Sequence, residues 1–187
     1  MNSDLRSLQG PDLLQKEHQT EAFDCGIPAL NDYLKKYAWQ SQTGRGARTY
    51  VVTRDEKVVG YFTLAYGSVS TLDAPPRMKQ GLGLYPIPIL VLARLAIDRQ
   101  AQKKGLGKAL LKQALLKALK ASDIAGLRAV LVHAKDQLAK SFYKRYGFIE
   151  FPSDEFRLYL LIKDIENSIE QDPLQKKISS EIESLVY

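Results

Sequence analysis

The sequence predicts an α/β chain (α+β in the stricter sense) with helices packed on a mixed β-sheet, and three observations favour this fold class. The 187 residues are 45% hydrophobic, which is enough for one α/β core of ordinary size. Short apolar, β-leaning runs alternate with stretches of helical period. The apolar run over residues 90–97 turns into a long helical stretch that starts with Gly105-Leu106-Gly107. We expect a single domain over residues 1–163 and an acidic extension, helical or mobile, over residues 164–187.

The N-terminal part is expected to be irregular before its first helix. Residues 1–12 look frayed, a short first strand is expected within residues 13–25, and Asp24-Cys25-Gly26 reads as a turn. Pro28 stands where a helix can begin, and apolar residues recur at helical spacing as far as Ala38.

The next part is expected to form a hairpin between two loops. Residues 42–48 read as a flexible basic loop, and strands are expected over residues 49–53 and 57–70 with Asp55-Glu56 at the turn. Residues 73–88 are rich in proline and glycine and are therefore expected to form a loop.

The second half is expected to alternate between strands and helices. After the strand at residues 90–97, the helix whose first residues are Gly105-Leu106-Gly107 meets no further glycine or proline until Gly126. Asp136 is placed to cap a helix that runs to Tyr146. Strands are expected over residues 127–134, 148–151 and 157–163.

The charge and the cysteine count exclude several classes of protein. The chain carries a net charge of +6, but residues 164–187 alone carry −4, so the remainder is strongly basic and suits either nucleic acid or a phosphorylated cofactor. Its single cysteine, Cys25, excludes an internal disulfide and a Cys-rich zinc site, and we expect no metal. No run of eighteen apolar residues is present, so we expect a cytoplasmic protein without a membrane partner.

The turn that leads into the long helix is a candidate anion site. Unpaired amide N–H groups and the positive end of the helix dipole favour an anion there, and glycine lets the anion approach closely. Seven basic residues and no acidic residue lie between Arg99 and Lys120. The glycine spacing fits neither a dinucleotide-binding fingerprint nor a P-loop. We therefore expect this turn to bind the pyrophosphate of a ligand for which neither of these two motifs is built.

The segment Gln102 to Gly107 resembles the acetyl-CoA motif Q/R-x-x-G-x-G/A of the GCN5-related N-acetyltransferase (GNAT) family. LARLAID over residues 92–98, FDCG over residues 23–26 and FYKRYGF over residues 142–148 resemble the toxin branch, whose members acetylate aminoacyl-tRNA. The resemblance spans residues 13–163. It implies a GNAT fold, whose mixed, mostly antiparallel central sheet of six to seven strands is flanked by about four helices and splays between the fourth and fifth strands.

The resemblance also implies how acetyl-CoA is bound. The pantetheine arm would bond to the backbone at the end of the strand that includes Leu95, Ala96 and Ile97. The pyrophosphate would lie against backbone amides of the loop, with added charge from a lysine. The residues expected here are Gln102, Lys103, Lys104, Gly105, Leu106, Gly107 and Lys108.

Tyr143 stands where the family carries a tyrosine beside the CoA sulfur. A phenol stays protonated at neutral pH and can supply the proton that the departing thiolate needs. The alternative, a core aromatic residue without a chemical role, stays open, and Tyr146 is assigned to packing. Many GNAT enzymes have an asparagine at the position of Asp136. An ionised carboxylate cannot donate the same hydrogen bonds, so a CoA contact at Asp136 is in doubt.

The sequence offers no clear general base, and this favours an acceptor amine that is already largely neutral. An α-amino group titrates near 7.7 to 8.0, whereas lysine titrates near 10.4. Cys25 and His133 are interpreted as structural residues. The tRNA would be held through phosphate contacts, although plain surface charge or, for Arg94, an internal ion pair are open alternatives. The residues expected to contact tRNA are Arg45, Arg48, Arg77, Lys79 and Arg94.

The function that the resemblance implies is a toxin that acetylates the α-amino group of aminoacyl-tRNA and so inhibits translation. It further implies a homodimer and an antitoxin of the ribbon-helix-helix class as partner. One alternative is a GNAT enzyme that acts on a small-molecule or protein amine. Another is a non-catalytic module that senses acetyl-CoA or docks a partner.

Overall fold

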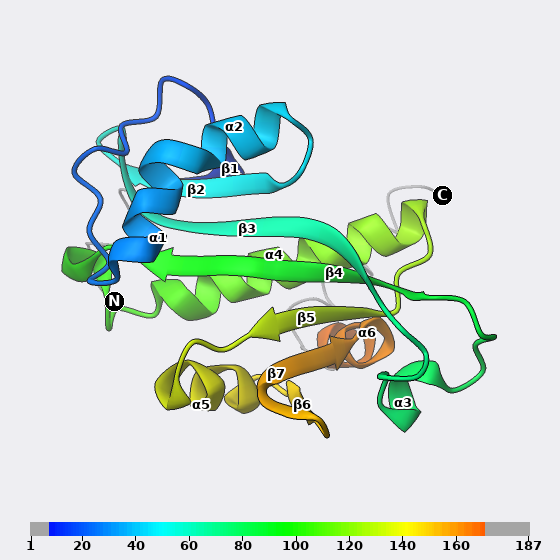
Figure 1. Ribbon diagram of the computed structural model, residues 1–187. Helices are drawn as coiled ribbons and strands as arrows, with labels where there is room; N and C mark the ends of the chain where they lie inside the picture. The colour runs from blue at the N-terminus through cyan, green and yellow to red at the C-terminus, as the bar shows by residue number, and fades with distance from the viewer. Residues whose placement is uncertain (1–7, 171–187) are drawn as a thin grey trace, which may run out of the picture. The chain divides into compact units, whose positions relative to one another are not determined.

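The computed structural model describes residues 8–170, in which seven strands form one sheet in the order β1-β2-β3-β4-β5-β7-β6 (Figure 1). The pairs β1–β2, β2–β3, β5–β7 and β6–β7 are antiparallel. The predicted combination of helices with one large sheet is therefore confirmed, and the splay between the fourth and fifth strands stays a prediction.

Contacts along the chain divide it into two compact units. Among the described residues, unit 1 comprises residues 8–68 and 90–117, and unit 2 comprises residues 69–89 and 118–170. Both units draw on the range expected to form one domain, and that expectation stays a prediction.

Unit 1 contains most of the strand and helix that flank the candidate anion site, and its elements follow the expected order. Their bounds are β1 (Gln9–Leu13), α1 (Pro28–Asp32), η2 (Tyr33–Tyr37), α2 (Ala38–Thr43), β2 (Arg48–Arg54), β3 (Lys57–Val69), β4 (Ile87–Ile97), η3 (Arg99–Ala101) and α4 (Leu106–Ile124). The ends of β3 and α4 and the start of β4 belong to unit 2.

The first strand lies earlier than the sequence indicated. We expected residues 1–12 to be frayed and a short strand to lie within residues 13–25, but β1 ends at Leu13. It pairs with β2 from Gln9 opposite Thr53 to Leu13 opposite Tyr50. Gly10 and Pro11 break the apolar alternation, and an edge strand tolerates proline because only one side forms ladder hydrogen bonds.

The first helix continues past its expected end. Tyr33–Tyr37 form a π-helical segment, η2, within the predicted helix, and α2 extends to Thr43. Residues 42 and 43 are therefore helical, not part of the expected loop. The side-chain amide of Gln42 explains this, because it donates to the Leu14 carbonyl at 2.6 Å and accepts from the Thr49 amide at 3.2 Å.

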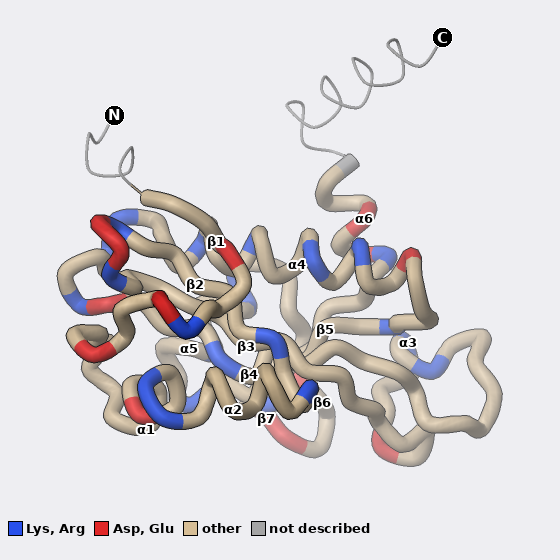
Figure 2. The backbone as a smooth tube through the Cα atoms, turned by 90° about the horizontal axis from the view of Figure 1, so that it is seen from above, with Lys and Arg blue, Asp and Glu red and all other residues tan. Residues whose placement is uncertain are grey.

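The strands of unit 1 carry helices on two faces. Ala96 belongs to a buried cluster with Tyr33, Leu34 and Phe23 on the side of α1 and η2. The neighbouring Ile97 side chain points to the other face, where it meets Gly60 together with Leu106 and Leu110 of α4. In α4 the apolar residues Leu110, Leu111, Ala114 and Ala118 recur at helical spacing and are buried, and basic residues recur along the helix (Figure 2).

Unit 2 contains an antiparallel set of strands with its own helices. Its elements are α3 (Pro76–Lys79), β5 (Ala129–His133), α5 (Gln137–Arg145), β6 (Ile149–Phe151), β7 (Asp154–Leu161) and α6 (Ile162–Glu170). The single turn α3 lies inside the predicted loop, and β7 begins three residues earlier than expected.

The start of the acidic extension docks as a helix. Ile165 of α6 is 3% exposed, so this part packs on the unit. The apolar residues predicted further along, Ile178, Ile182 and Leu185, lie outside the described residues.

Residues 8–170 contain neither a candidate membrane span nor a candidate metal site. Within this range, no helix combines the length and the apolar character needed to cross a membrane. No group of three or more His, Cys, Asp or Glu side chains in the same range is arranged to hold a metal ion.

Candidate functional site

The turn before α4 has the backbone geometry of an anion site. Lys103 and Gly105 adopt positive φ angles of 61° and 85°, which brings the chain sharply into the helix. Within residues 8–170, apart from the residues next to Gly105 in the chain, no atom lies within 4 Å of the position that a Gly105 Cβ would occupy, so the space beside the turn is open. Among the described residues, no side chain accepts a hydrogen bond from the amides of Gly105 to Lys108, and the first turn of a helix leaves such amides unpaired. This arrangement suits a pyrophosphate.

The side chain of Gln102 has a structural task in this loop. Its amide donates to the Ile97 carbonyl at 2.9 Å and to the Cys25 carbonyl at 3.0 Å. The loop is thus fixed to the end of β4 by the first residue of its own motif. Lys103 and Lys108 are exposed and Lys104 is partly buried, so their charge reaches the solvent beside the turn.

The residues expected to meet the pantetheine arm are the last three of β4. Leu95 and Ile97 are partly buried, and Ala96 is 5% exposed. The chain then leaves the strand through Asp98, whose amide donates to the Val59 carbonyl at 2.9 Å. The end of β4 and the loop that follows it therefore adjoin, as the sequence predicted. Their contacts with a ligand stay a prediction.

Arg94 lies on β4 three residues before the strand ends. Its guanidinium carbon is 3.7 Å from the centre of the Tyr33 ring, which stacks on Tyr61 with 6.4 Å between ring centres. The Tyr61 hydroxyl donates to the Leu30 carbonyl at 2.8 Å, and Tyr61 is fully buried. No carboxylate in the described part of the chain pairs with Arg94. The guanidinium is therefore held by an aromatic face and keeps its N–H donors for another partner.

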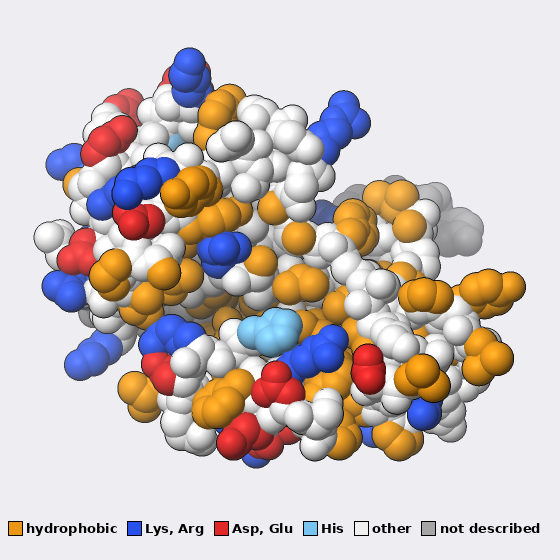
Figure 3. Space-filling view, viewed as in Figure 1, with side chains coloured by type: hydrophobic (Ala, Val, Ile, Leu, Met, Phe, Trp, Pro, Cys, Tyr) orange, Lys and Arg blue, Asp and Glu red, His pale blue; other side chains and the backbone are white. Residues whose placement is uncertain are grey.

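The other residues expected to contact tRNA differ in whether their charge is already paired within the chain. Arg45 and Arg48 flank the start of β2, and both are exposed. Lys79 is exposed in α3, but Arg77 beside it forms an ion pair with Asp164, with 3.1 Å from Nη2 to each carboxylate oxygen. On the face shown in Figure 3, acidic and basic side chains are mixed around α1. The basic side chains on this face therefore do not form one uniform patch.

Tyr143 lies in unit 2 on α5, with 8% of its surface exposed. Its ring packs against Phe142 and Phe148, with 5.2 and 5.4 Å between ring centres. Burial raises the pKa of the Tyr143 phenol to about 12. No hydrogen bond engages its hydroxyl within residues 8–170. The hydroxyl is therefore protonated at neutral pH and able to donate.

Asp136 caps α5, as predicted. Its Oδ1 accepts from the Ala139 amide at 2.8 Å, and its Oδ2 pairs with Lys135. These hydrogen bonds, that from Lys135 first, hold the pKa of the Asp136 carboxyl below its usual value of 3.8. Both oxygens thus have partners inside the chain. His133 ends β5, exposed, opposite Arg157 of β7.

The structure also contains buried or partly buried basic residues with structural roles that the sequence did not reveal. Lys140 of α5 has only 7% of its side chain exposed and pairs with Glu155 at 2.8 Å and Glu150 at 3.2 Å, which fixes α5 to the β6–β7 hairpin. Arg128 donates to the carbonyls of Met78 and Gln80 and so holds α3. Neither role has a signal in the sequence, because isolated basic residues normally indicate solvated surface.

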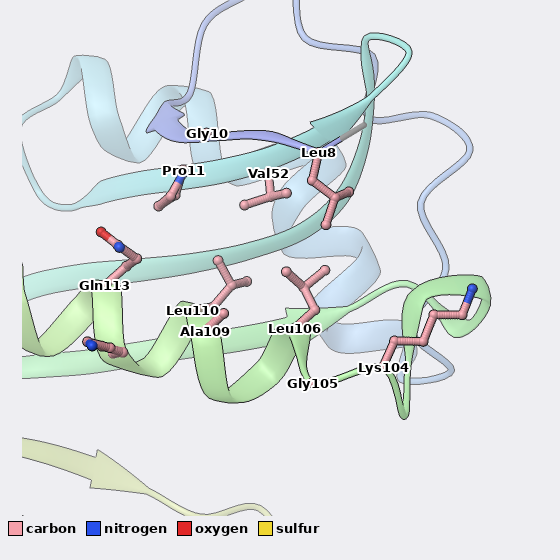
Figure 4. A pocket seen from close by; sticks show the side chains of 11 residues that line it. Leu8, Gly10, Pro11, Val52, Lys104, Gly105, Leu106, Ala109, Leu110 and Gln113 are labelled. Carbon is pink, nitrogen blue, oxygen red and sulfur yellow. The ribbon is translucent and has the colours of Figure 1, made fainter. Parts of the chain in front are cut away.

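A hollow of about 360 Å³ lies between β1 and the start of α4 (Figure 4). Its walls are mostly apolar, with Pro11, Val52, Leu106 and Leu110 among them and Lys104 at the rim. An apolar lining does not suit a pyrophosphate, and we assign no ligand to it.

Comparison with known proteins places these features in a family. Residues 45–150 match the acetyltransferase (GNAT) domain, a range that includes both the loop and Tyr143. The chain is 43% identical over 143 residues to the tRNA-acetylating toxin of Mycobacterium tuberculosis, a match that covers 76% of this chain and 86% of the relative.

Solved structures agree with the sequence comparison. The toxin AtaT in complex with acetyl-methionyl-tRNAfMet superposes with a TM-score of 0.77 at 30% identity, over 83% of this chain and 95% of that chain. An AtaT mutant bound to the C-terminus of the antitoxin AtaR and acetyl-CoA superposes with a TM-score of 0.73 at 29% identity, over 86% of this chain and 97% of that chain.

Proposed function

Because the chain belongs to the GNAT family of acetyltransferases, we propose that it transfers acetyl from acetyl-CoA to the α-amino group of aminoacyl-tRNA and acts as a translation-inhibiting toxin. The observation that carries this proposal is the 43% identity to a tRNA-acetylating toxin over most of both chains. The open, glycine-containing start of α4 supports the acetyl-CoA half of it.

The residues present fit acetyl-CoA, whose thioester would supply the activated acetyl group. The amides of Gly105 to Lys108 would bind the pyrophosphate, with charge from Lys103, Lys104 and Lys108. The backbone of Leu95 and Ile97 would align the pantetheine arm. No metal has a part in this mechanism.

The chemistry needs one acid and little help from a base. The neutral α-amine attacks the thioester carbonyl, the C–N bond forms, and the C–S bond breaks. The Tyr143 hydroxyl gives its proton to the departing thiolate, the attacking amine loses a proton to solvent, and solvent returns one proton to Tyr143. Because an α-amino group titrates near 7.7 to 8.0, a useful fraction is already neutral at physiological pH.

The acceptor would be held mainly through phosphates. Arg94 is the strongest candidate because Tyr33 orients its planar fork, and Arg can bind a phosphate through two N–H groups. Arg45 and Arg48 would add contacts that do not read sequence. Arg77 would first have to leave Asp164, which makes it the weakest of the set.

We further propose a homodimer and neutralisation by a ribbon-helix-helix antitoxin. The complex of AtaT with the C-terminus of AtaR supports an antitoxin partner in general. Aminoacyl-tRNA is used in the cytoplasm, so we propose that the protein acts there.

Cell-free translation tests the toxin function directly. Purified protein with acetyl-CoA is expected to stop translation, whereas protein alone in an extract freed of acetyl-CoA, or acetyl-CoA with Tyr143→Phe, is expected to leave it running. Unchanged translation in the presence of wild-type protein and acetyl-CoA would exclude the toxin. Turnover on a polyamine or a protein lysine instead would favour the alternative acceptor.

A further inference from the structure

The segment Phe23–Gly26 lies against the turn that leads to the candidate pyrophosphate site. The Asp24 amide donates to Asp98 Oδ2 at 2.9 Å, and the Arg99 amide donates to the Asp24 carbonyl at 2.9 Å. The Gln102 side chain donates to the Cys25 carbonyl at 3.0 Å. Three hydrogen bonds thus join two segments that are more than seventy residues apart in sequence.

The Asp24 carboxylate is the centre of this contact. Its Oδ1 accepts from the Gly26 amide at 2.9 Å and from Asn31 Nδ2 of α1 at 2.8 Å. Its Oδ2 pairs with Arg99 Nη1 at 3.2 Å. The hydrogen bond from Gly26, and then that from Asn31, lower the pKa of Asp24, so the carboxylate is ionised at neutral pH. One side chain therefore holds its own turn, the first helix and the loop.

The other residues of the segment fit the same arrangement. Phe23 is 1% exposed and packs edge-on against Tyr61, which anchors the segment in the core. The Cys25 amide donates to Asn31 Oδ1 at 2.9 Å. Gly26 has a φ of +88°, and a Cβ there would lie 2.9 Å from Arg99 Nε. Glycine is thus needed both for the backbone conformation and for the space that Arg99 occupies.

From these contacts we propose that Asp24 is a positioning residue that fixes the loop from Asp98 to Gly107 for acetyl-CoA binding. This inference rests on the proposed function. The amides at the start of α4 can bind one pyrophosphate together only if the preceding turn holds a single conformation. Asp98, Arg99 and Gln102, the loop residues that contact the segment, all lie in the same loop before the left-handed Gly105.

Simple electrostatics predicts that removal of the Asp24 charge strengthens acetyl-CoA binding. Asp24 is a negative charge close to a site for an anion, so removal of that charge alone would favour acetyl-CoA. Loss of the positioning contacts would instead weaken its binding, because the neutral side chain of the Asp24→Asn variant cannot form the ion pair with Arg99. The sign of the change therefore distinguishes a positioning role from mere proximity.

The experiment is calorimetric titration of acetyl-CoA into wild type, Asp24→Asn and the control Asp12→Asn. Asp12 is an exposed aspartate of unit 1 whose side chain has no partner within residues 8–170. We expect Asp24→Asn to bind acetyl-CoA about two- to fivefold more weakly, the scale of a lost exposed ion pair. In steady-state kinetics, KM for acetyl-CoA should rise while kcat at saturation stays at the wild-type value, and Asp12→Asn should behave as wild type.

Two results would overturn the inference. The first is acetyl-CoA affinity in folded Asp24→Asn that equals or exceeds that of Asp12→Asn. The second, decisive if Asp24→Asn does not fold, is unchanged affinity in Arg99→Gln, which removes the other half of the ion pair. Failure of wild type to bind acetyl-CoA would instead refute the proposed function, so the two failures are distinguishable.

Discussion

Helices α4 and α5 both begin shortly after a strand, but their first turns are satisfied in opposite ways. At α5 the chain supplies its own acceptor, since the Asp136 carboxylate takes the Ala139 amide. At α4 glycines replace any such side chain, and no side chain within residues 8–170 accepts from Gly105 to Lys108. A helix start closed by its own carboxylate stabilises the fold, whereas an open one retains amides and dipole for an anionic ligand.

The strongest way to break this contrast is to give α4 a carboxylate of its own. Gly105→Asp places a negative charge at the open helix start, and like charges opposed in this way cost several kcal/mol. We expect acetyl-CoA affinity to fall by about 100-fold or more relative to Gly105→Asn. The asparagine variant has nearly the same size and also tolerates the positive φ of this position. Equal affinities in the two variants, measured by calorimetry, would show that the anion is bound elsewhere.

The next prediction separates binding at α4 from chemistry at α5. Tyr143→Phe keeps the ring contacts with Phe142 and Phe148 but removes the hydroxyl. We expect kcat for acetyl transfer to fall by about 10²- to 10⁴-fold, the usual contribution of a general acid, with acetyl-CoA affinity unchanged. The same substitution three residues later, Tyr146→Phe, serves as the control and should retain activity. A wild-type rate in Tyr143→Phe would reduce Tyr143 to a core aromatic residue.

The smallest expected effect concerns the closed helix start. Asp136→Ala removes the cap and should lower the free energy of unfolding by about 1 kcal/mol, or the melting temperature by about 2–4 °C. Because the folded-state pKa of Asp136 lies below its usual value of 3.8, its stabilisation is present above that value and is lost as the pH falls through the folded-state pKa.

Thermal melts at pH 7 and pH 3 check this prediction. The difference between wild type and Asp136→Ala should shrink at the lower pH. Asp136→Asn can still cap the helix and should stay close to wild type at pH 7. A constant difference between wild type and the alanine variant at both pH values would show that the ionised carboxylate contributes nothing to the cap.

The sequence predicted the elements around the site better than the contacts that hold them. The glycine spacing and the long helical stretch after it located α4, and Asp136 followed by a helical stretch located α5, because these signals are local. The first strand was misplaced because Gly10 and Pro11 hide its pattern. Its position depends on pairing with β2, which no short stretch of sequence records.

Polar contacts between residues far apart in the chain could not be predicted from the sequence, for the same reason. Asp24 and Arg99 look like ordinary surface charges until the fold brings them together. Lys140 reads as a solvated helix position, but its side chain is buried between two glutamates. Arg77, which was expected to contact tRNA, pairs with Asp164, a residue of the predicted acidic extension.

The most direct test of the account is transfer of label from radioactive acetyl-CoA to total charged tRNA. The account predicts label in the tRNA fraction with wild type, released when the tRNA is deacylated, and none with Tyr143→Phe or Gly105→Asp. Label that remains on the tRNA after deacylation would mean modification of the nucleic acid itself. No label in tRNA while acetyl-CoA is consumed on another amine would contradict the proposed acceptor.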